Sequence, residues 1–336
     1  MEQDFKQDIS SVLEPADMNR RELLKQLGTI ATAALAGSAL PGHVFARSGA
    51  AAGESRVFPV TTVNHLSYAS RDWAKARDFY VDLFGMRVVW DDGKSCALEF
   101  GSVAAPNGMY IRPFSATETK PSINHIGYGL PNFMEHKAAL RAELERRGLR
   151  NFRPDGEVGW ICDDPVGYML NIIVIKDKAM YPGAATPCDV AASEACKAGW
   201  ESGIKNLENA SKPSGKGFKA THYGYVVLNV SDIPKEREFY KEALGMKVIG
   251  EKPDECFLRF GENTLILRPA GPDGKAVCNQ FAFAVQNFNA KAVEAELKRR
   301  GLDPKPETEL GWSITDPDGL KIAVAANGLP ERMAKG

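Results

Sequence analysis

Two histidines of this chain lie in near-identical five-residue words. His65 belongs to NHLSY at residues 64–68, and His125 belongs to NHIGY at residues 124–128. Each word is typical of the start of a β-strand. Because the chain has only 5 histidines, two in matched settings predict symmetry-related strands that bring both imidazoles to one point. Converging imidazoles suit a divalent metal; the alternative is a pair of inward-facing histidines that hydrogen-bond to each other or to nearby hydroxyls.

The strands that carry these histidines belong to a duplicated sequence. Ordered matches pair the following ranges: 78–89 with 238–249, 98–101 with 258–261, 111–113 with 267–269, 142–149 with 295–302, 157–160 with 309–312 and 164–167 with 316–319. Cys96 and Cys256 fall at matching places, which predicts that both pack in the core. So many matches in the same order indicate two copies of one domain.

Each copy divides again into two halves of the same kind. Residues 72–84 are predicted to form a helix, because apolar residues repeat at helical spacing and Gly85 follows them as a stop. Residues 133–147 do the same and end at Gly148. Alternating apolar stretches after each helix predict short strands. The sequence therefore predicts a strand, a helix and three strands, repeated four times.

These words resemble the vicinal oxygen chelate superfamily, which includes glyoxalase I, extradiol ring-cleavage dioxygenases and bleomycin resistance proteins. The resemblance covers residues 58–326 and rests on His65 seven residues before Asp72, the helix end at residues 79–86, and the Asp-Pro-x-Gly turn at residues 164–167. It implies an α+β fold in which four βαβββ modules form two paired half-barrel domains. We expect the domains at residues 58–176 and 219–327, with a linker at residues 177–218.

The resemblance also implies a ligand set in the first domain. His65 and His125 take the first-strand ligand positions, and the usual glutamate falls on Asn171, seven residues after Asp164. An amide oxygen is neutral and binds a hard cation less strongly than a carboxylate does. The affinity for the ion should therefore fall, or another acid must approach it; the candidates are Glu157, Asp163 and Glu99, none of which is at a family ligand position. Arg112, near a fourth family position, is expected either to assist catalysis by binding an anionic oxygen or to form a strand-end salt bridge.

The second copy has lost these ligands. Its matching positions are Tyr225, Gln280 and Ala323, so no metal site is expected there. His222 lies in a similar word and offers a different alignment, but the standard spacing favours Tyr225. Arg268 is the counterpart of Arg112, and Arg268, Tyr225 and Trp160 are expected to contact the substrate. Tyr68 and Tyr128, three residues after the histidines, should face away from them.

Three functions remain open. The leading hypothesis is a metal-dependent dioxygenase that binds Fe(II), Mn(II) or Zn(II) and acts on a small catechol-like or other vicinal-oxygen substrate. Extradiol dioxygenases, however, usually keep the metal in their second copy. The second is a lyase or isomerase of the glyoxalase type, which needs a general base. The third is a metal-free protein that sequesters small molecules, with Trp160 or Trp312 as stacking surfaces.

The N-terminal 46 residues are predicted to be a twin-arginine export signal. Arg20 and Arg21 precede an Ala-rich apolar stretch over residues 27–40, which is too short to span a bilayer comfortably. We therefore expect a periplasmic protein that uses the twin-arginine export machinery and is not inserted in the membrane after cleavage. It would be a monomer or homodimer, in which Cys188 and Cys196 could pair. The formal net charge of -1, without basic runs, argues against nucleic-acid partners.

Overall fold

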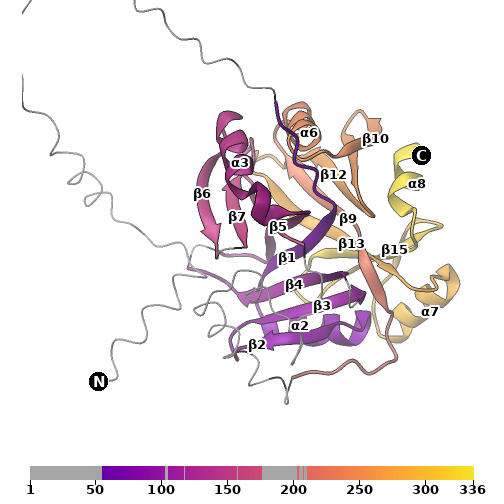
Figure 1. Ribbon diagram of the computed structural model, residues 1–336. Helices are drawn as coiled ribbons and strands as arrows, with labels where there is room; N and C mark the ends of the chain where they lie inside the picture. Colours follow the sequence, from indigo (N-terminus) through magenta and orange to yellow (C-terminus); the bar gives the residue numbers. More distant parts are fainter. Residues whose placement is uncertain are drawn as a thin grey trace, which may run out of the picture. The chain divides into compact units, whose positions relative to one another are not determined.

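The computed structural model describes residues 55–102, 105–116, 118–156, 158–175, 203, 207 and 210–336 (Figure 1). The predicted export signal, Glu157, Cys188, Cys196 and most of the predicted linker lie outside these residues. Within the described part of the chain, four strand-helix-strand-strand-strand modules follow one another, as predicted.

The first two modules make up the first barrel. Their elements are β1 (Thr62–Ser70), α2 (Trp73–Phe84), β2 (Arg87–Asp91), β3 (Cys96–Ser102), β4 (Ala105–Pro113), β5 (Ser122–Leu130), α3 (Phe133–Arg146), β6 (Arg150–Asp155), β7 (Gly159–Asp163) and β8 (Met169–Val174). The strands are hydrogen-bonded in the order β2-β3-β4-β1-β5-β8-β7-β6. Strands β1 and β4 are parallel, β5 and β8 are parallel, and β1 joins the two modules by pairing antiparallel with β5.

The last two modules repeat this arrangement in the second barrel. Their elements are β9 (Ala220–Val230), α6 (Ile233–Glu242), β10 (Lys247–Lys252), β11 (Glu255–Phe260), β12 (Asn263–Pro269), β13 (Val277–Val285), α7 (Ala290–Arg299), β14 (Lys305–Thr308), β15 (Gly311–Thr315) and β16 (Lys321–Ala325), followed by α8 (Leu329–Lys335). The strand order is β10-β11-β12-β9-β13-β16-β15-β14. The predicted α+β fold of two paired half-barrels is confirmed.

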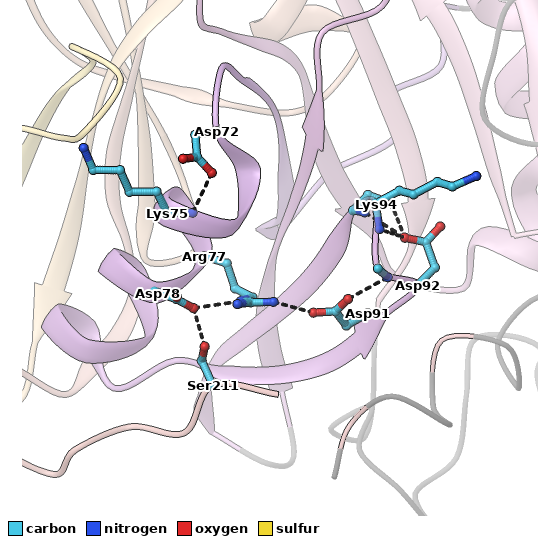
Figure 2. Close-up of polar contacts among 10 residues, drawn as sticks. Asp72, Lys75, Arg77, Asp78, Asp91, Asp92, Lys94 and Ser211 are labelled. Atoms are coloured by element: carbon cyan, nitrogen blue, oxygen red, sulfur yellow. Dashed lines mark hydrogen bonds and ion pairs between the residues drawn. The ribbon is translucent and has the colours of Figure 1, made fainter. Parts of the chain in front are cut away.

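Local sequence sets where α2 begins and ends, and an ion pair holds this helix against its sheet (Figure 2). The Asp72 carboxylate caps the helix by accepting a hydrogen bond from the Lys75 amide at 3.1 Å, and Gly85 ends it in the left-handed conformation at φ 65°. Arg77 lies between helix and sheet, 2.7 Å from Asp91 in β2 and 2.8 Å from Asp78. Arg77 thereby ties the outer surface of α2 to the first β-hairpin.

The larger apolar cluster lies on the helix-covered faces of the sheets, and a smaller one, which includes Tyr225, Ala282 and Leu329 of α8, lies on the concave face of the second barrel. Tyr68 and Tyr128 are fully buried in the larger cluster, as strand alternation predicted. Cys96 and Cys256 are also buried as free thiols, which confirms their predicted packing role. Within the described residues, no helix has the length and apolar character needed to cross a membrane.

The two barrels contact each other through the words that recur in the sequence. The hydroxyl of Tyr80 in α2 donates to Asp316 at 2.8 Å, and the hydroxyl of Tyr240 in α6 donates to Asp164 at 3.3 Å. Each aspartate begins the Asp-Pro-x-Gly turn of the opposite barrel. The Phe-Tyr helix word and the Asp-Pro turn word are therefore partners across the interface, once in each direction.

Candidate metal centre

The register of β1 against β5 brings His65 and His125 together. His65 pairs with Gly127, and His125 pairs with Ser67, so both histidines lie on the concave face of the barrel. Their Nε2 atoms are 3.1 Å apart, and the rings are nearly perpendicular at 88°. The two imidazoles therefore converge in the structure, as predicted.

Each imidazole is oriented by the asparagine that precedes it. Nδ1 of His65 is 3.0 Å from Oδ1 of Asn64, and Nδ1 of His125 is 2.9 Å from Oδ1 of Asn124. The Asn64 amide is itself fixed, because its Nδ2 donates to the Val174 carbonyl at 3.0 Å. Nδ1 of His65 must therefore carry the proton, which leaves a lone pair on Nε2 facing His125. A histidine that binds a metal is typically held this way.

Gly127 makes room for the His65 ring. A Cβ at position 127 would overlap the imidazole of His65 at Cε1 and Nδ1. The glycine in the NHIGY word is therefore a steric requirement of the site. Its counterpart in the second barrel is Ala282, which occupies the same register position on β13.

The electrostatic surroundings keep His125 neutral. Burial, together with the positive charges of Arg112 and Arg153, lowers the pKa of His125 to about 3. A neutral imidazole is the form that binds metals. With metal-nitrogen bonds of about 2.0–2.1 Å, Nε2 atoms 3.1 Å apart subtend roughly 95–100° at a shared ion, which fits common coordination geometries.

Asn171 lies on the same face, in register with Gly127 on the neighbouring strand. Its side chain is fully buried, and its Nδ2 donates to Asp155 at 2.6 Å. Its Oδ1 is buried and has no hydrogen-bond partner among the described residues. A buried amide oxygen without a donor is costly unless something else binds it, and a cation would meet that need.

Asp155 is the acid that the sequence analysis missed. It ends β6, and burial raises its pKa while the hydrogen bond from Asn171 opposes that rise.

The predicted acids are placed differently. Glu99 is fully buried on the same face but lies two strands from His65, Asp163 accepts from Asn151, and Glu157 is outside the described residues. Over the described residues, no group of three or more His, Cys, Asp and Glu side chains is placed to hold an ion.

Arg112 forms the salt bridge that was the alternative prediction. Its two terminal nitrogens lie 2.6 and 2.7 Å from the carboxylate oxygens of Glu118, and this pairing contributes to lowering the pKa of Glu118 to about 2. A catalytic role for Arg112 stays a prediction, made harder by this pairing. Arg153 on β6 is the second cation of the concave face, and it donates to the sulfur of Met169 at 3.0 Å. No carboxylate among the described residues lies within ion-pair distance of Arg153.

Trp160 does not line the concavity, so its role as a stacking surface stays a prediction that this placement does not support. Its neighbour Ile161 is in register with Asn171 on the concave face, and alternation turns Trp160 to the helix side. There its indole nitrogen donates to the Lys137 carbonyl of α3 at 3.2 Å. Trp312 does the same in the second barrel, where it donates to Ala290 at 2.9 Å.

The second barrel fills the same centre with a closed polar cluster. Tyr225 and Gln280 hold the register positions of His65 and His125, in agreement with the standard spacing. The Tyr225 hydroxyl donates to Glu307, and Nε2 of Gln280 lies 2.8 Å from that hydroxyl and 3.0 Å from Glu307. Arg268 donates to Gln280 at 3.0 Å, and Lys321 lies 2.8 Å from Glu307. Substrate contacts by Tyr225 and Arg268 stay predictions, since both are engaged within the protein.

Comparison with known proteins gives a family and a fold. The sequence model of the Glyoxalase/Bleomycin resistance protein/Dioxygenase superfamily matches residues 62–146 and 222–324. The Mn(II)-bound glyoxalase from Novosphingobium aromaticivorans matches with a TM-score of 0.60 at 17% identity, over 81% of this chain and 83% of that one.

Two dioxygenases are similar in structure to the same extent. The 2,3-dioxygenase LapB from Pseudomonas sp. KL28 has a TM-score of 0.59 at 14% identity, over 81% of this chain and 93% of that one. Homoprotocatechuate 2,3-dioxygenase from Arthrobacter globiformis has a TM-score of 0.57 at 16% identity, over 81% of each chain. At these identities the likeness establishes the arrangement of modules and leaves the reaction to be argued from the site.

Proposed function

Because the chain belongs to the glyoxalase/bleomycin resistance protein/dioxygenase superfamily, we propose that its first barrel binds a divalent metal and acts on a small substrate with two neighbouring oxygen atoms. The observation that carries the proposal is the pair of Nε2 atoms 3.1 Å apart on rings whose other nitrogens are bound by asparagine oxygens. His65 and His125 would hold the ion, with Asn171 as the third protein donor.

The ion, when bound, would supply Lewis acidity and a template for the two substrate oxygens. Fe(II), Mn(II) and Zn(II) all accept imidazole and oxygen donors, so the ligand types do not choose among them. Arg153 would bind an anionic oxygen of the substrate, because its guanidinium shares the concave face with His125. Gly127 leaves the space that the His65 ring needs to bind the ion.

The leading reaction is oxygen-dependent cleavage of a catechol-like compound. Two solved 2,3-dioxygenases with this fold support that choice by analogy alone. A glyoxalase-type isomerase or lyase is the second candidate, and Asp155 is the observation in its favour. Asp155 is a buried carboxylate with a raised pKa, and it is hydrogen-bonded to Asn171. Such a group is suited to act as a general base. Oxygen consumption with substituted catechols distinguishes the two, since an isomerase consumes none.

The decisive experiment measures metal content. The full chain, purified anaerobically after loading with Mn²⁺, Fe²⁺ or Zn²⁺, should retain one ion, and a His65→Ala/His125→Ala variant should retain none. Gln280→Ala is the matched control, because Gln280 holds the register position of His125 in the second barrel and should leave binding unchanged. A folded wild-type protein that retains no ion, yet binds aromatic ligands, would overturn the proposal in favour of metal-free sequestration.

We also propose that the protein is exported through the twin-arginine pathway. The support is the pair Arg20 and Arg21 ahead of a short apolar stretch. Replacing both by lysine should retain the protein in the cytoplasm of cells that express the full chain, as measured by fractionation. Unchanged periplasmic recovery of that variant would contradict the proposal.

A further inference from the structure

We propose that Asp155 supplies the negative charge of the metal site through Asn171, in place of the carboxylate that the family resemblance puts at position 171. This inference rests on the proposed function. The contact that carries it is the hydrogen bond of 2.6 Å from Asn171 Nδ2 to Asp155 Oδ2. Because Nδ2 is engaged by the carboxylate, the ligating atom left to Asn171 is Oδ1, which is buried and has no partner among the described residues.

The backbone of β7 allows this contact. Asp155 pairs with Gly159, which in turn pairs with Ile173, two residues after Asn171. A Cβ at position 159 would come within 3.1 Å of the Asp155 Cβ and 3.2 Å of Asn171 Oδ1. The glycine therefore leaves the space in which the carboxylate and the amide meet.

The second barrel shows how far a carboxylate at this position extends. Glu307 is the counterpart of Asp155, since each lies four residues before the glycine of the repeated Gly-Trp word. Glu307 accepts hydrogen bonds from Tyr225 and Gln280, the residues at the two histidine positions. An acid at the end of this edge strand can therefore act on the centre of the barrel in this same chain. Aspartate is one methylene shorter, and Asn171 spans the remaining gap.

The charge balance explains why such an acid is needed. Two neutral imidazoles and an amide give a dication no negative ligand, and Arg153 adds a positive charge nearby. When the NH₂ group of an amide donates a hydrogen bond to a carboxylate, the bond polarises the amide and increases the negative partial charge on its oxygen. That oxygen then binds a cation more strongly. Groups that orient and polarise ligands in this way typically change metal affinity about 10–100-fold.

The test is calorimetric titration of the full chain with Mn²⁺ alone, supported by the electron paramagnetic resonance spectrum of the bound ion. Asp155→Asn keeps the size of the side chain and removes its charge, and we expect about 10–100-fold weaker binding. Asp163→Asn is the matched control, because Asp163 is on the same face and hydrogen-bonded to Asn151. It should bind like wild type.

A charge exchange sharpens the test. The Asp155→Asn/Asn171→Asp double variant restores a carboxylate and keeps an amide to pair with it, so binding should return at least to the wild-type level, with an altered resonance spectrum. It also guards against misfolding of the single variant. Wild-type binding with an unaffected Asp155→Asn variant, or a loss confined to Glu99→Gln, would overturn this inference and leave the proposed function intact. Absence of wild-type binding would overturn the proposed function itself.

Discussion

The two barrels have the same strand order, and the register of their central strands is the same, but the polar groups at the two centres differ. In the first barrel, His65 faces His125 with a lone pair, and a buried amide oxygen of Asn171 lacks a donor among the described residues. In the second, Tyr225 and Gln280 both donate to Glu307. The first centre therefore has an excess of acceptors, whereas the second balances its acceptor with donors from the protein.

This difference shows how a duplicated fold can keep its shape without its ligand. A concave barrel face contains buried polar positions that must be satisfied, either by an ion or by an internal cluster. The second barrel reaches the same end with a carboxylate, two neutral donors and the cation of Lys321. In the first barrel, the histidine nitrogens and the Asn171 amide oxygen would be satisfied by a bound cation.

The largest effect is expected from Gly127→Ala in the first barrel. The added methyl group would overlap the His65 ring and displace Nε2, so Mn²⁺ affinity should fall by at least about 100-fold in a calorimetric titration. Ala282→Gly, at the same register position of the second barrel, should leave Mn²⁺ affinity unchanged. Equal affinity in the two variants would show that His65 is not a ligand.

A second contrast concerns the interface and predicts a pH dependence. Glu236 of α6 is fully buried beside Asp164, and burial together with the Asp164 charge raises the pKa of Glu236 to about 9. The first-barrel counterpart is Ala76, which has no charge. The unfolded chain loses this proton near pH 4.5, whereas the folded protein keeps it up to about pH 9. The free energy of unfolding should therefore fall by up to about 1.4 kcal/mol per pH unit across that window.

Chemical denaturation at pH 6, 7, 8 and 9 measures this slope. Glu236→Gln should flatten it and be more stable than wild type at the alkaline end. Glu296→Gln is a useful control, because nearby arginines lower the pKa of Glu296 to about 2 and it is ionised throughout the window. A wild-type slope that survives in Glu236→Gln would assign the pH dependence to another group.

The fold was predictable because it depends on repeated local signals. The helix stops at Gly85 and Gly148, the apolar spacing before them and the ordered duplicate words define four modules without any long-range contact. The ligand strands were predictable for the same reason, since His65 and His125 share one word. The interface between the barrels could not be predicted, although the sequence contains both the Phe-Tyr helix motif and the Asp-Pro turn motif that form it. That Tyr80 meets Asp316, and Tyr240 meets Asp164, depends on how the barrels pack.

The errors at the site come from strand faces. Trp160 was assigned to the concavity although its position relative to Asn171 puts it on the other side. Asp155 was missed because β6 has no clear alternation and a register shift between Arg150 and Arg153 sets which residues face inward. One signal could have found it. The position is acidic in both copies, as Asp155 and Glu307, which lie two residues before the matched ranges 157–160 and 309–312.

The interface hydrogen bonds predict a moderate difference between the two directions. Tyr80→Phe removes a bond of 2.8 Å to the buried Asp316 carboxylate and should cost about 1.5–3 kcal/mol of unfolding free energy. Tyr240→Phe should cost less, since its bond to Asp164 is 3.3 Å and Glu236 can still share a proton with that carboxylate. Urea denaturation at pH 7 measures both. A larger loss of stability in Tyr240→Phe than in Tyr80→Phe would contradict this account of the two hydrogen bonds.

The smallest contrast is between two versions of one ion pair. Arg77 pairs with Asp91 in the first barrel at 2.7 Å, where both side chains are mostly buried, and Arg237 pairs with the half-exposed Glu251 in the second at the same distance. Solvent screens the second pair, so Glu251→Gln should change stability by less than about 0.5 kcal/mol, whereas Asp91→Asn should cost about 1 kcal/mol. Asparagine can still accept from the Gly93 amide, so the turn is preserved. Repeating the urea titrations in 1 M salt should leave the Asp91→Asn difference largely intact, because a pair removed from solvent is screened less than an exposed one. If salt abolishes that difference, Arg77 and Asp91 are no better shielded than their counterparts, and the first copy gains nothing from burying them.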